Sequence, residues 1–254
     1  MTIRPKAYVI CTSPRSGSTL LCKLLAATKR AGNPDSHFHQ PDIGAWLKTY
    51  DLNEDSFASD WHTLDAIFTA ARKRGSGDSG LFGLRMQRRS FAFFMRQLAL
   101  LCPGTMTDPD RIEATFGPTR FIHLTRQDKL SQAISLVKAT QTGLWHRAAD
   151  GSELERLSPS RGPSYDPEAI AKSLAEVTAL DAAWLDWFDG QDIHPLRVTY
   201  DELSAHPIAT LATVLDLLSV DQKAARHIRP SVAKLADATS EEWAKRFRAE
   251  HKFS

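Results

Sequence analysis

Apolar runs of strand length alternate with stretches of helical periodicity along the chain. The apolar runs, interpreted as buried strands, cover residues 7–12, 81–86, 120–125 and 194–200. Apolar residues at helical spacing predict helices over 19–28, 56–73, 91–101, 129–143, 166–188 and 207–218. Strands separated by helices predict an α/β fold, a three-layer domain whose mainly parallel sheet has helices on both faces.

Segments rich in proline, glycine and polar residues separate these elements. Residues 32–41 hold two prolines and form a predicted loop, and the run from Gly75 to Gly80 ends the helix before it. Residues 150–167 are rich in Ser, Pro and Gly, which predicts an exposed excursion. We find no internal repeat. Because alternating α/β folds often keep this much chain around one sheet, we expect a single domain over residues 1–254.

The composition is that of a globular protein with nearly balanced charge. Hydrophobic residues make up 42% and charged residues 24% of the chain, which argues against disorder. Subtracting 30 Asp and Glu from 32 Lys and Arg leaves a net charge of +2. That excess is too small for a protein dedicated to nucleic acid, so we expect no nucleic-acid partner. An anionic ligand must then be bound by locally placed groups.

The N-terminus and the cysteines bear on the compartment. Residues 1–17 lack the cleavage region of a signal peptide, and no stretch reaches the ~18 apolar residues that a membrane helix requires. Cys11, Cys22 and Cys102 make neither a disulfide framework nor a zinc site, and we interpret them as buried small residues in a reducing compartment. These features predict a cytoplasmic protein without membrane insertion.

The segment Ser13-Pro-Arg-Ser-Gly-Ser-Thr19 joins the first predicted strand to the first helix. Backbone N–H groups in such a turn, together with the helix N-terminus, form a cradle for an anion. Gly17 lets an oxyanion approach the backbone, and Arg15 adds a forked cation suited to phosphate or sulfate. The hydroxyl groups come from Ser16, Ser18 and Thr19. The alternative interpretation is an ordinary small-residue turn with an N-cap.

Comparison with the nucleoside triphosphatase pattern G-x-x-x-x-G-K-[ST] tests whether the loop is that of an ATP-using enzyme. With Gly17 on the second glycine, Thr12 falls on the first. Ser18 then takes the place of the lysine, and Thr19 takes that of the hydroxyl residue. The lysine that meets terminal phosphates is absent, and the charge comes from Arg15 instead. A kinase that uses ATP and Mg²⁺ is therefore the weaker alternative.

Four stretches, spread from the first strand to the end of the chain, resemble one enzyme family. They are residues 8–21, residues 31–35, residues 121–135 with 141–145, and residues 236–248. In order, they resemble the PAPS-dependent sulfotransferases (PAPS is 3′-phosphoadenosine 5′-phosphosulfate), and most closely the bacterial trehalose 2-sulfotransferase-like family. The resemblance implies a P-loop-type fold and the transfer of a sulfuryl group from PAPS, as co-substrate, with no metal.

The resemblance also implies roles for single residues. Those implied to bind PAPS are Arg15, Ser16, Gly17, Ser18, Thr19, Arg126 and Ser135. Arg15 would neutralise charge on the bridging and leaving oxygens, and Arg126 would pair with the 3′-phosphate, with Ser131 as the rival of Ser135. Without the resemblance, Arg126 beside Asp128 is interpreted as a surface ion pair. Tyr200 either lies near adenine or fills the core at a strand end.

The general base is where this chain departs from the family pattern. The trehalose enzymes place a glutamate two residues after the proline of the substrate loop, and this chain has Ser36 there. Its neighbours Asp35 and His37 are the predicted catalytic bases beside Arg15, with His39 as a further candidate. A metal site made by the two histidines lacks further ligands, so we predict none.

The acceptor is predicted to be a small molecule with a hydroxyl group, with a carbohydrate as one candidate. The loops at 36–56 and 144–166 are expected to shape its pocket. Trp46, Trp61 and Trp145 are candidates for stacking on a sugar, although burial is the default for tryptophan. Arg85, Arg88 and Arg89 attract an anionic acceptor or, as the favoured alternative, form an exposed basic face. A silent nucleotide-binding protein is the non-enzyme alternative, and the resemblance also implies a possible homodimer.

Overall fold

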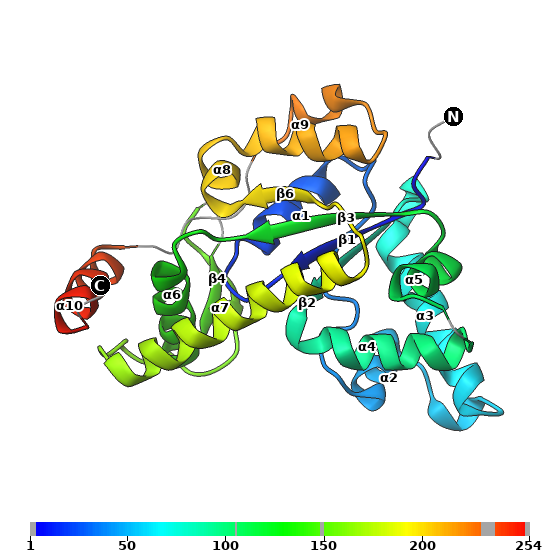
Figure 1. The fold of residues 1–254 in the computed structure, drawn as a ribbon, viewed down its shortest axis with the longest axis horizontal. Coiled ribbons are helices and arrows are strands. Elements are labelled where there is room, and N and C mark those ends of the chain that lie inside the picture. Colours follow the sequence, from blue (N-terminus) through cyan, green and yellow to red (C-terminus); the bar gives the residue numbers. More distant parts are fainter. Residues whose placement is uncertain (1–3, 105, 148–149, 230–236, 252–254) are drawn as a thin grey trace.

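The main sheet lies at the centre of the computed structural model, which describes residues 4–104, 106–147, 150–229 and 237–251. Its strands are β1 (Ala7–Thr12), β2 (Phe82–Gln87), β3 (Thr119–Thr125) and β6 (Leu196–Thr199). They lie in the order β2-β1-β3-β6, and all neighbours are parallel (Figure 1). The predicted parallel sheet is confirmed. Ala236, which begins the fourth family-like stretch, lies outside the described residues.

Helices cover both faces of this sheet, as the periodicity predicted. One face packs on α1 (Ser18–Ala27), α8 (Tyr200–Ala205) and α9 (Pro207–Leu217). The other packs on α2 (Ile43–Tyr50), α3 (Asp60–Ser76), α4 (Arg88–Leu101), α5 (Asp108–Phe116) and α7 (Pro167–Gly190). The alternation along β1 explains the two layers. Tyr8 and Ile10 join the first apolar cluster, while Val9 and Cys11 join the second.

A third apolar cluster holds the end of the described chain. Helix α6 (Lys129–Thr142) follows β3, and α10 (Ala238–Glu250) packs on α6 and α7. Trp243 and Phe247 of α10 are buried there beside Ile134 and Ile170. The family-like tail is therefore a helix that docks on the core through one apolar face.

Several segments differ from the sequence prediction, among them α8, an unpredicted helix that begins at Tyr200, the last residue of the fourth predicted strand. The loop predicted over 36–56 contains α2, whose N-cap Asp42 accepts a hydrogen bond from the Ala45 amide. A helix that we did not predict, α5, begins at a capping box made by Thr107 and Asp110. The predicted excursion contains strand β5 (Glu153–Arg156), which pairs with β4 (Leu144–Arg147) as an antiparallel hairpin. Helix α5 and strand β5 are short and polar, so their periodicity is weak, whereas α2 is apolar but has only eight residues.

The carboxyl ends of the parallel strands meet at one edge of the sheet. There Thr12 pairs in register with Leu124 and with Gln87, so the segments after β1, β2 and β3 leave the sheet side by side. The chain passes from β1 to β2 on one side of β1 and then to β3 on the other side. The carboxyl end of β1 is therefore a topological switch point. Ligands of open α/β sheets bind at such points.

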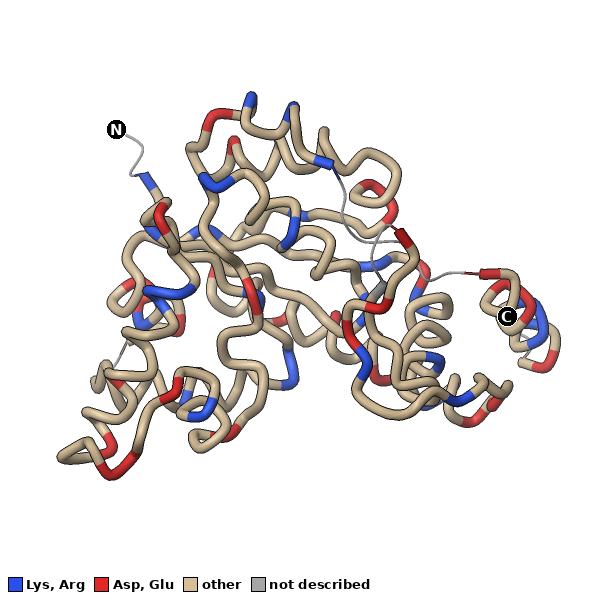
Figure 2. Tube along the Cα trace, turned by 180° about the vertical axis from the view of Figure 1, so that it is seen from behind, with Lys and Arg blue, Asp and Glu red and all other residues tan. Residues whose placement is uncertain are grey.

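Basic and acidic positions are scattered over all parts of the chain trace (Figure 2). This distribution agrees with the small net charge of +2. Cys11 and Cys22 are buried, as predicted, whereas Cys102 at the end of α4 is half-buried. Across the described parts of the chain, no helix has the length and apolar character to cross a membrane.

Candidate active site

The loop between β1 and α1 turns sharply at two residues with positive φ. Gly17, the N-cap of α1, has a φ of 87°, and Arg15 has a φ of 63°. The Gly17 position also has no room for a side chain, because a Cβ there would lie 2.6 Å from Cδ2 of Tyr200. Glycine is therefore required by both the backbone conformation and the tyrosine ring.

Buried side chains behind the loop hold its backbone. Gln132 of α6 donates from Nε2 to the Ser13 hydroxyl, at 2.9 Å, and to the Pro14 carbonyl. From α7, Trp184 donates from Nε1 to the Thr12 carbonyl at 2.8 Å. Ser16 is fully buried, and its hydroxyl bonds with that of Thr12, so its side chain supports the loop rather than facing the cavity.

Arg15 spans from the loop to two other elements. Its Nε donates to the Ser135 hydroxyl of α6 at 3.0 Å, and its Nη1 donates to the Trp145 carbonyl of β4 at 2.5 Å. Burial, reinforced by the charge of Arg126, lowers the pKa of the guanidinium to about 10, so it stays charged at neutral pH. The structure thus brings together Arg15 and Ser135.

Arg126 follows β3 and lies over the ring of Tyr200, 4.6 Å from its centroid. Its Nε is buried without a hydrogen-bond partner among the described residues. The predicted ion pair with Asp128 is not formed, because Asp128 caps α6 through Ser131 and lies 3.8 Å from Arg248. Tyr200 is half-buried at the cavity rather than packed in the core. An unpartnered cationic donor of this kind suits an anion.

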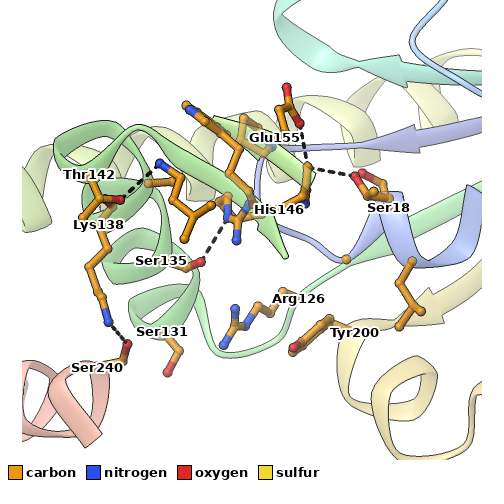
Figure 3. A pocket seen from close by; sticks show the side chains of 18 of the residues that line it. Ser18, Arg126, Ser131, Ser135, Lys138, Thr142, His146, Glu155, Tyr200 and Ser240 are labelled. Carbon is orange, nitrogen blue, oxygen red and sulfur yellow. Dashed lines mark hydrogen bonds and ion pairs between the residues drawn. The ribbon is translucent and has the colours of Figure 1, made fainter. Parts of the chain in front are cut away.

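Both arginines line one cavity of about 1790 Å³. Figure 3 shows Arg126, Ser131 and Ser135 facing it from β3 and α6, with Lys138 and Ser240 at one end. Single ligands occupy pockets of about 300–1,000 Å³. The volume is therefore sufficient for two molecules at once.

Arg85 connects the phosphate-type loop to the predicted substrate loop. Its Nε donates to the Ser36 hydroxyl at 2.7 Å, its Nη1 to the Thr19 hydroxyl at 2.8 Å and its Nη2 to Asp35 at 3.1 Å. Its side chain is only 17% exposed. Arg88, in turn, lies over the rings of Phe91 and Trp184. The favoured interpretation of an exposed basic face was wrong for Arg85 and Arg88, whose guanidinium groups have inward partners, whereas Arg89 is exposed and pairs with Glu176.

The predicted bases Asp35, His37 and His39 are divided between two cavities. His37 is 5% exposed, and its Nε2 lies 3.2 Å from the Asn33 carbonyl in a second, smaller cavity. Burial lowers the pKa of His37. The exposed Asp35 also borders the second cavity, whereas Ser36 and His39 line the large one. His37 and His39 therefore face different spaces, which argues against a shared metal site.

The three tryptophans have different environments. Trp46 is buried in the apolar core, and Trp61 is 47% exposed on α3, where the default of burial was wrong. Trp145, on the hairpin, lines the large cavity. Both loops expected to shape the pocket contribute to its lining: residues 36 and 39–41 of the first, and residues 144–146, 153, 155–157, 160, 161 and 163 of the second.

His146, the residue after Trp145, is a site residue that sequence reasoning missed. Its Nε2 lies 3.0 Å from the Thr19 hydroxyl and 3.4 Å from the Glu155 carboxylate. Burial, followed by the charges of Arg15 and Arg85, lowers the pKa of His146 to about 4. The signal was present in the sequence only as a histidine that follows the third family-like stretch.

Comparison with known proteins identifies the family. The model of the Stf0 sulphotransferase family matches residues 7–250. A trehalose 2-sulfotransferase of Mycobacterium tuberculosis is 30% identical, with 98% of this chain and 96% of the relative covered. One of Mycolicibacterium smegmatis is 28% identical over the same shares. A solved sulfotransferase domain from the Synechococcus PCC 7002 olefin synthase covers 98% of this chain and 89% of its own, with 15% identity and a TM-score of 0.45.

The chain belongs to the Stf0 sulphotransferase family. It is accordingly a transferase of the sulfotransferase class, as its motifs predicted.

Proposed function

We propose that this member of the Stf0 family transfers a sulfuryl group from PAPS to a hydroxyl group of a small sugar. The observation that carries the proposal is the placement of Arg15 and Arg126 in one cavity, each without a carboxylate within ion-pair distance among the described residues. The two mycobacterial relatives are trehalose 2-sulfotransferases, so trehalose is the first acceptor to test.

In this proposal the donor lies along the loop from Arg15 toward Arg126. The backbone N–H groups of residues 16–19 and the N-terminus of α1 hold the 5′-phosphate. Ser18, which lines the cavity, adds a hydroxyl group. Arg126 pairs with the 3′-phosphate while Tyr200 supports its guanidinium, and Ser131 or Ser135 donates to the same group.

Arg15 stabilises the charge that develops on the bridging oxygen as the sulfuryl group moves. Sulfuryl transfer, like phosphoryl transfer, depends on in-line positioning and charge stabilisation more than on covalent chemistry. Arg15 is suited to this because α6 and β4 already hold its guanidinium in place. The cost of ordering this side chain is therefore met before the substrates bind.

The acceptor occupies the other side of the loop, between Ser36 and the hairpin. Ser36, His39 and Arg85 line this part of the cavity and offer donors and acceptors for sugar hydroxyl groups. Asp35 and His37 remain candidate bases only if the substrate loop moves, because both border the second cavity. We also propose that the donor and acceptor sites belong to one domain. The transfer is proposed to need no metal ion.

Calorimetry with 3′-phosphoadenosine 5′-phosphate (PAP), ADP and ATP tests the donor assignment. We expect PAP to bind more tightly than either adenine nucleotide without a 3′-phosphate, and Mg²⁺ to leave this order unchanged. Tighter Mg²⁺-dependent binding of ATP would contradict the proposal and favour the kinase. Transfer of labelled sulfate from PAPS to trehalose and to a panel of mono- and disaccharides then tests the reaction. PAP binding with no transfer to any sugar would favour the silent nucleotide-binding alternative.

A further inference from the structure

The proton of the acceptor hydroxyl needs a group to receive it near Arg15. Ser36, at the position of the family's acid, has a hydroxyl that is not a base at neutral pH. Asp35 is paired with Arg85, and the ring of His37 is enclosed in the second cavity. Neither of these two predicted bases lines the large cavity in which Arg15 lies.

The β4–β5 hairpin places the imidazole of His146 near Arg15. His146 lines the large cavity, and its side chain is 23% exposed. It contacts Thr19, two residues after Gly17 in the phosphate-type loop, while the carbonyl of the preceding Trp145 accepts from Arg15. The imidazole therefore lies beside the residue assigned to the leaving oxygen, and on the acceptor side of the loop.

The contacts of His146 favour one tautomer. Glu155 is a carboxylate that accepts hydrogen bonds, and it lies 3.4 Å from Nε2. The Thr19 hydroxyl accepts from Arg85 at 2.8 Å and lies 3.0 Å from Nε2 of His146, and its oxygen has a second lone pair that can accept. A proton on Nε2 satisfies both neighbours, and the lone pair is then on Nδ1. No other described side chain is bonded to that nitrogen.

The surroundings keep this imidazole neutral. The charged groups that face it are Arg15 from the loop, Lys23 from α1, Arg85 from β2 and Glu155 from β5. Burial and the three cations lower the pKa of His146 to about 4. A bound anion near Arg15 offsets part of the cationic charge and raises the pKa toward its ordinary value, which makes the imidazole a stronger base.

We propose that Nδ1 of His146 accepts the proton of the acceptor hydroxyl, a role that rests on the proposed function. The hydroxyl oxygen forms a bond to sulfur, and the bond between sulfur and the bridging oxygen breaks. The bridging oxygen keeps the electron pair as part of the 5′-phosphate of PAP, and the hydroxyl proton moves to Nδ1 and then to water. Nothing is oxidised or reduced. Glu155 acts as a positioning residue that holds the Nε2 proton.

His146→Gln is the central variant, because its amide can keep an N–H toward Thr19 and Glu155 and removes the basic nitrogen. We expect kcat for transfer from PAPS to the best sugar of the panel to fall about 10²-fold, the size of a general-base contribution. Affinity for PAP, measured by calorimetry, should not change. His194→Gln, at a histidine that is 94% exposed and away from the cavity, should retain both.

His146→Ala with added imidazole gives an independent readout. Free imidazole should restore part of kcat in this variant and none in Arg15→Ala, because it supplies a base and not a guanidinium. At limiting PAPS, kcat/KM reports the free enzyme and should show no decline from pH 8 to pH 6 through protonation of His146, because the imidazole of the free protein is already neutral there. In His146→Gln the rate should be lowered throughout that range.

The outcomes separate this inference from the proposed function. No transfer by the wild type to any sugar would overturn both. Wild-type transfer with an unchanged kcat in His146→Gln would overturn this inference alone. A fall in PAP affinity that matches the fall in kcat would also overturn it, because the role would then be structural. His39 lines the same cavity, so a larger loss of kcat in His39→Gln than in His146→Gln would assign the proton to His39 instead.

Discussion

The two walls of the large cavity are held in different ways. The wall formed by the phosphate-type loop rests on buried side chains, with Gln132 and Trp184 bonded to its backbone. The opposite wall, the β4–β5 hairpin, has shifts in its strand register on both sides of His146. Leu154 and Leu157 in or beside it are 44% and 68% exposed. The phosphate-type loop is therefore part of the buried core, whereas the hairpin lies on the surface of that core.

The attachment of the hairpin runs partly through the residues assigned to the chemistry, and partly through Trp145, whose side chain packs on a cluster with Leu136 and Val177. The hairpin is bonded to the loop by Arg15 at Trp145 and by Thr19 at His146. Donor binding is therefore built into the stable part of the fold, whereas the acceptor side takes part of its position from the donor side. We expect substitutions in the loop wall to change binding or stability, and substitutions in the hairpin to change turnover with little effect on stability.

Arg15→Ala should have the largest effect, because this residue belongs to one wall and holds the other. We expect the rate of transfer at saturating PAPS to fall about 10²- to 10³-fold, as for the loss of one charge-stabilising donor. Arg15→Lys keeps the charge without the fork and should recover only part of the rate. Full activity of the alanine variant in a labelled-sulfate assay would refute the assignment.

Arg126→Ala tests the donor side of the cavity, at the turn after β3, without changing the hairpin. The loss of charge-assisted bonds should weaken PAP binding about 10- to 100-fold in calorimetry. Affinity for AMP, which has no 3′-phosphate, should change much less. The exposed Arg226 provides the matched control, since Arg226→Ala removes a cation far from the cavity. An equal loss of affinity for both nucleotides would contradict a 3′-phosphate role.

Asp181→Asn tests the support of the turn that carries Arg126. Asp181 of α7 accepts from His123 at 3.1 Å and from Lys129 at 2.9 Å, on both sides of the turn that carries Arg126. Burial alone raises the pKa of this carboxyl, but hydrogen bonds from His123 and Lys129 outweigh it and lower the pKa to about 2. We expect the variant to lose about 2 kcal/mol of unfolding free energy at neutral pH.

The pH dependence of that loss has a definite sign. Because the folded pKa of Asp181 lies below its ordinary value of 3.8, its contribution is present above that value and disappears as the pH falls toward 2. Urea unfolding of wild type and variant should therefore converge at acid pH. Asp189→Asn, at an exposed carboxylate later in the same helix, is the control. A difference that persists unchanged to acid pH would rule out the ionised carboxyl as its cause.

Leu157→Ser should have the smallest effect. The residue follows the hairpin and is 68% exposed, so a polar replacement changes the unfolding free energy by no more than about 0.5 kcal/mol. The rate of sulfate transfer should also be retained. A loss several times larger in urea unfolding would show that the hairpin is covered in solution and would remove the contrast between the two walls.

The same contrast explains which features could be predicted from sequence. The strands of the main sheet and α1, α6, α7 and α9 carry long apolar patterns, because each buries one face in the core. The hairpin lacks such a pattern. Strand β5 alternates charged residues with one exposed leucine, and its register depends on contacts with Thr142 and Gly143 that no local pattern records.

Site residues that directly follow apolar strands could be predicted from the sequence, whereas those placed by tertiary contacts could not. Arg15, Gly17 and Arg126 follow apolar strands, and their placement in one cavity follows from the parallel sheet. The inward position of Arg85 depends on three partners from two other segments. His37 and His39 are two residues apart, yet they face different cavities because the ring of His37 packs against Phe82 and Asn33. Sequence spacing alone does not distinguish such neighbours.

The close approach of Tyr200 to Gly17 has an evolutionary consequence. A side chain at position 17 would displace the tyrosine ring, and the ring carries the guanidinium of Arg126 on its face. Three positions that are far apart in the chain are thus coupled by volume. A residue larger than glycine at position 17 therefore requires both a left-handed backbone there and the loss of the ring at position 200. Substitutions at positions 17, 126 and 200 are therefore expected to depend on one another.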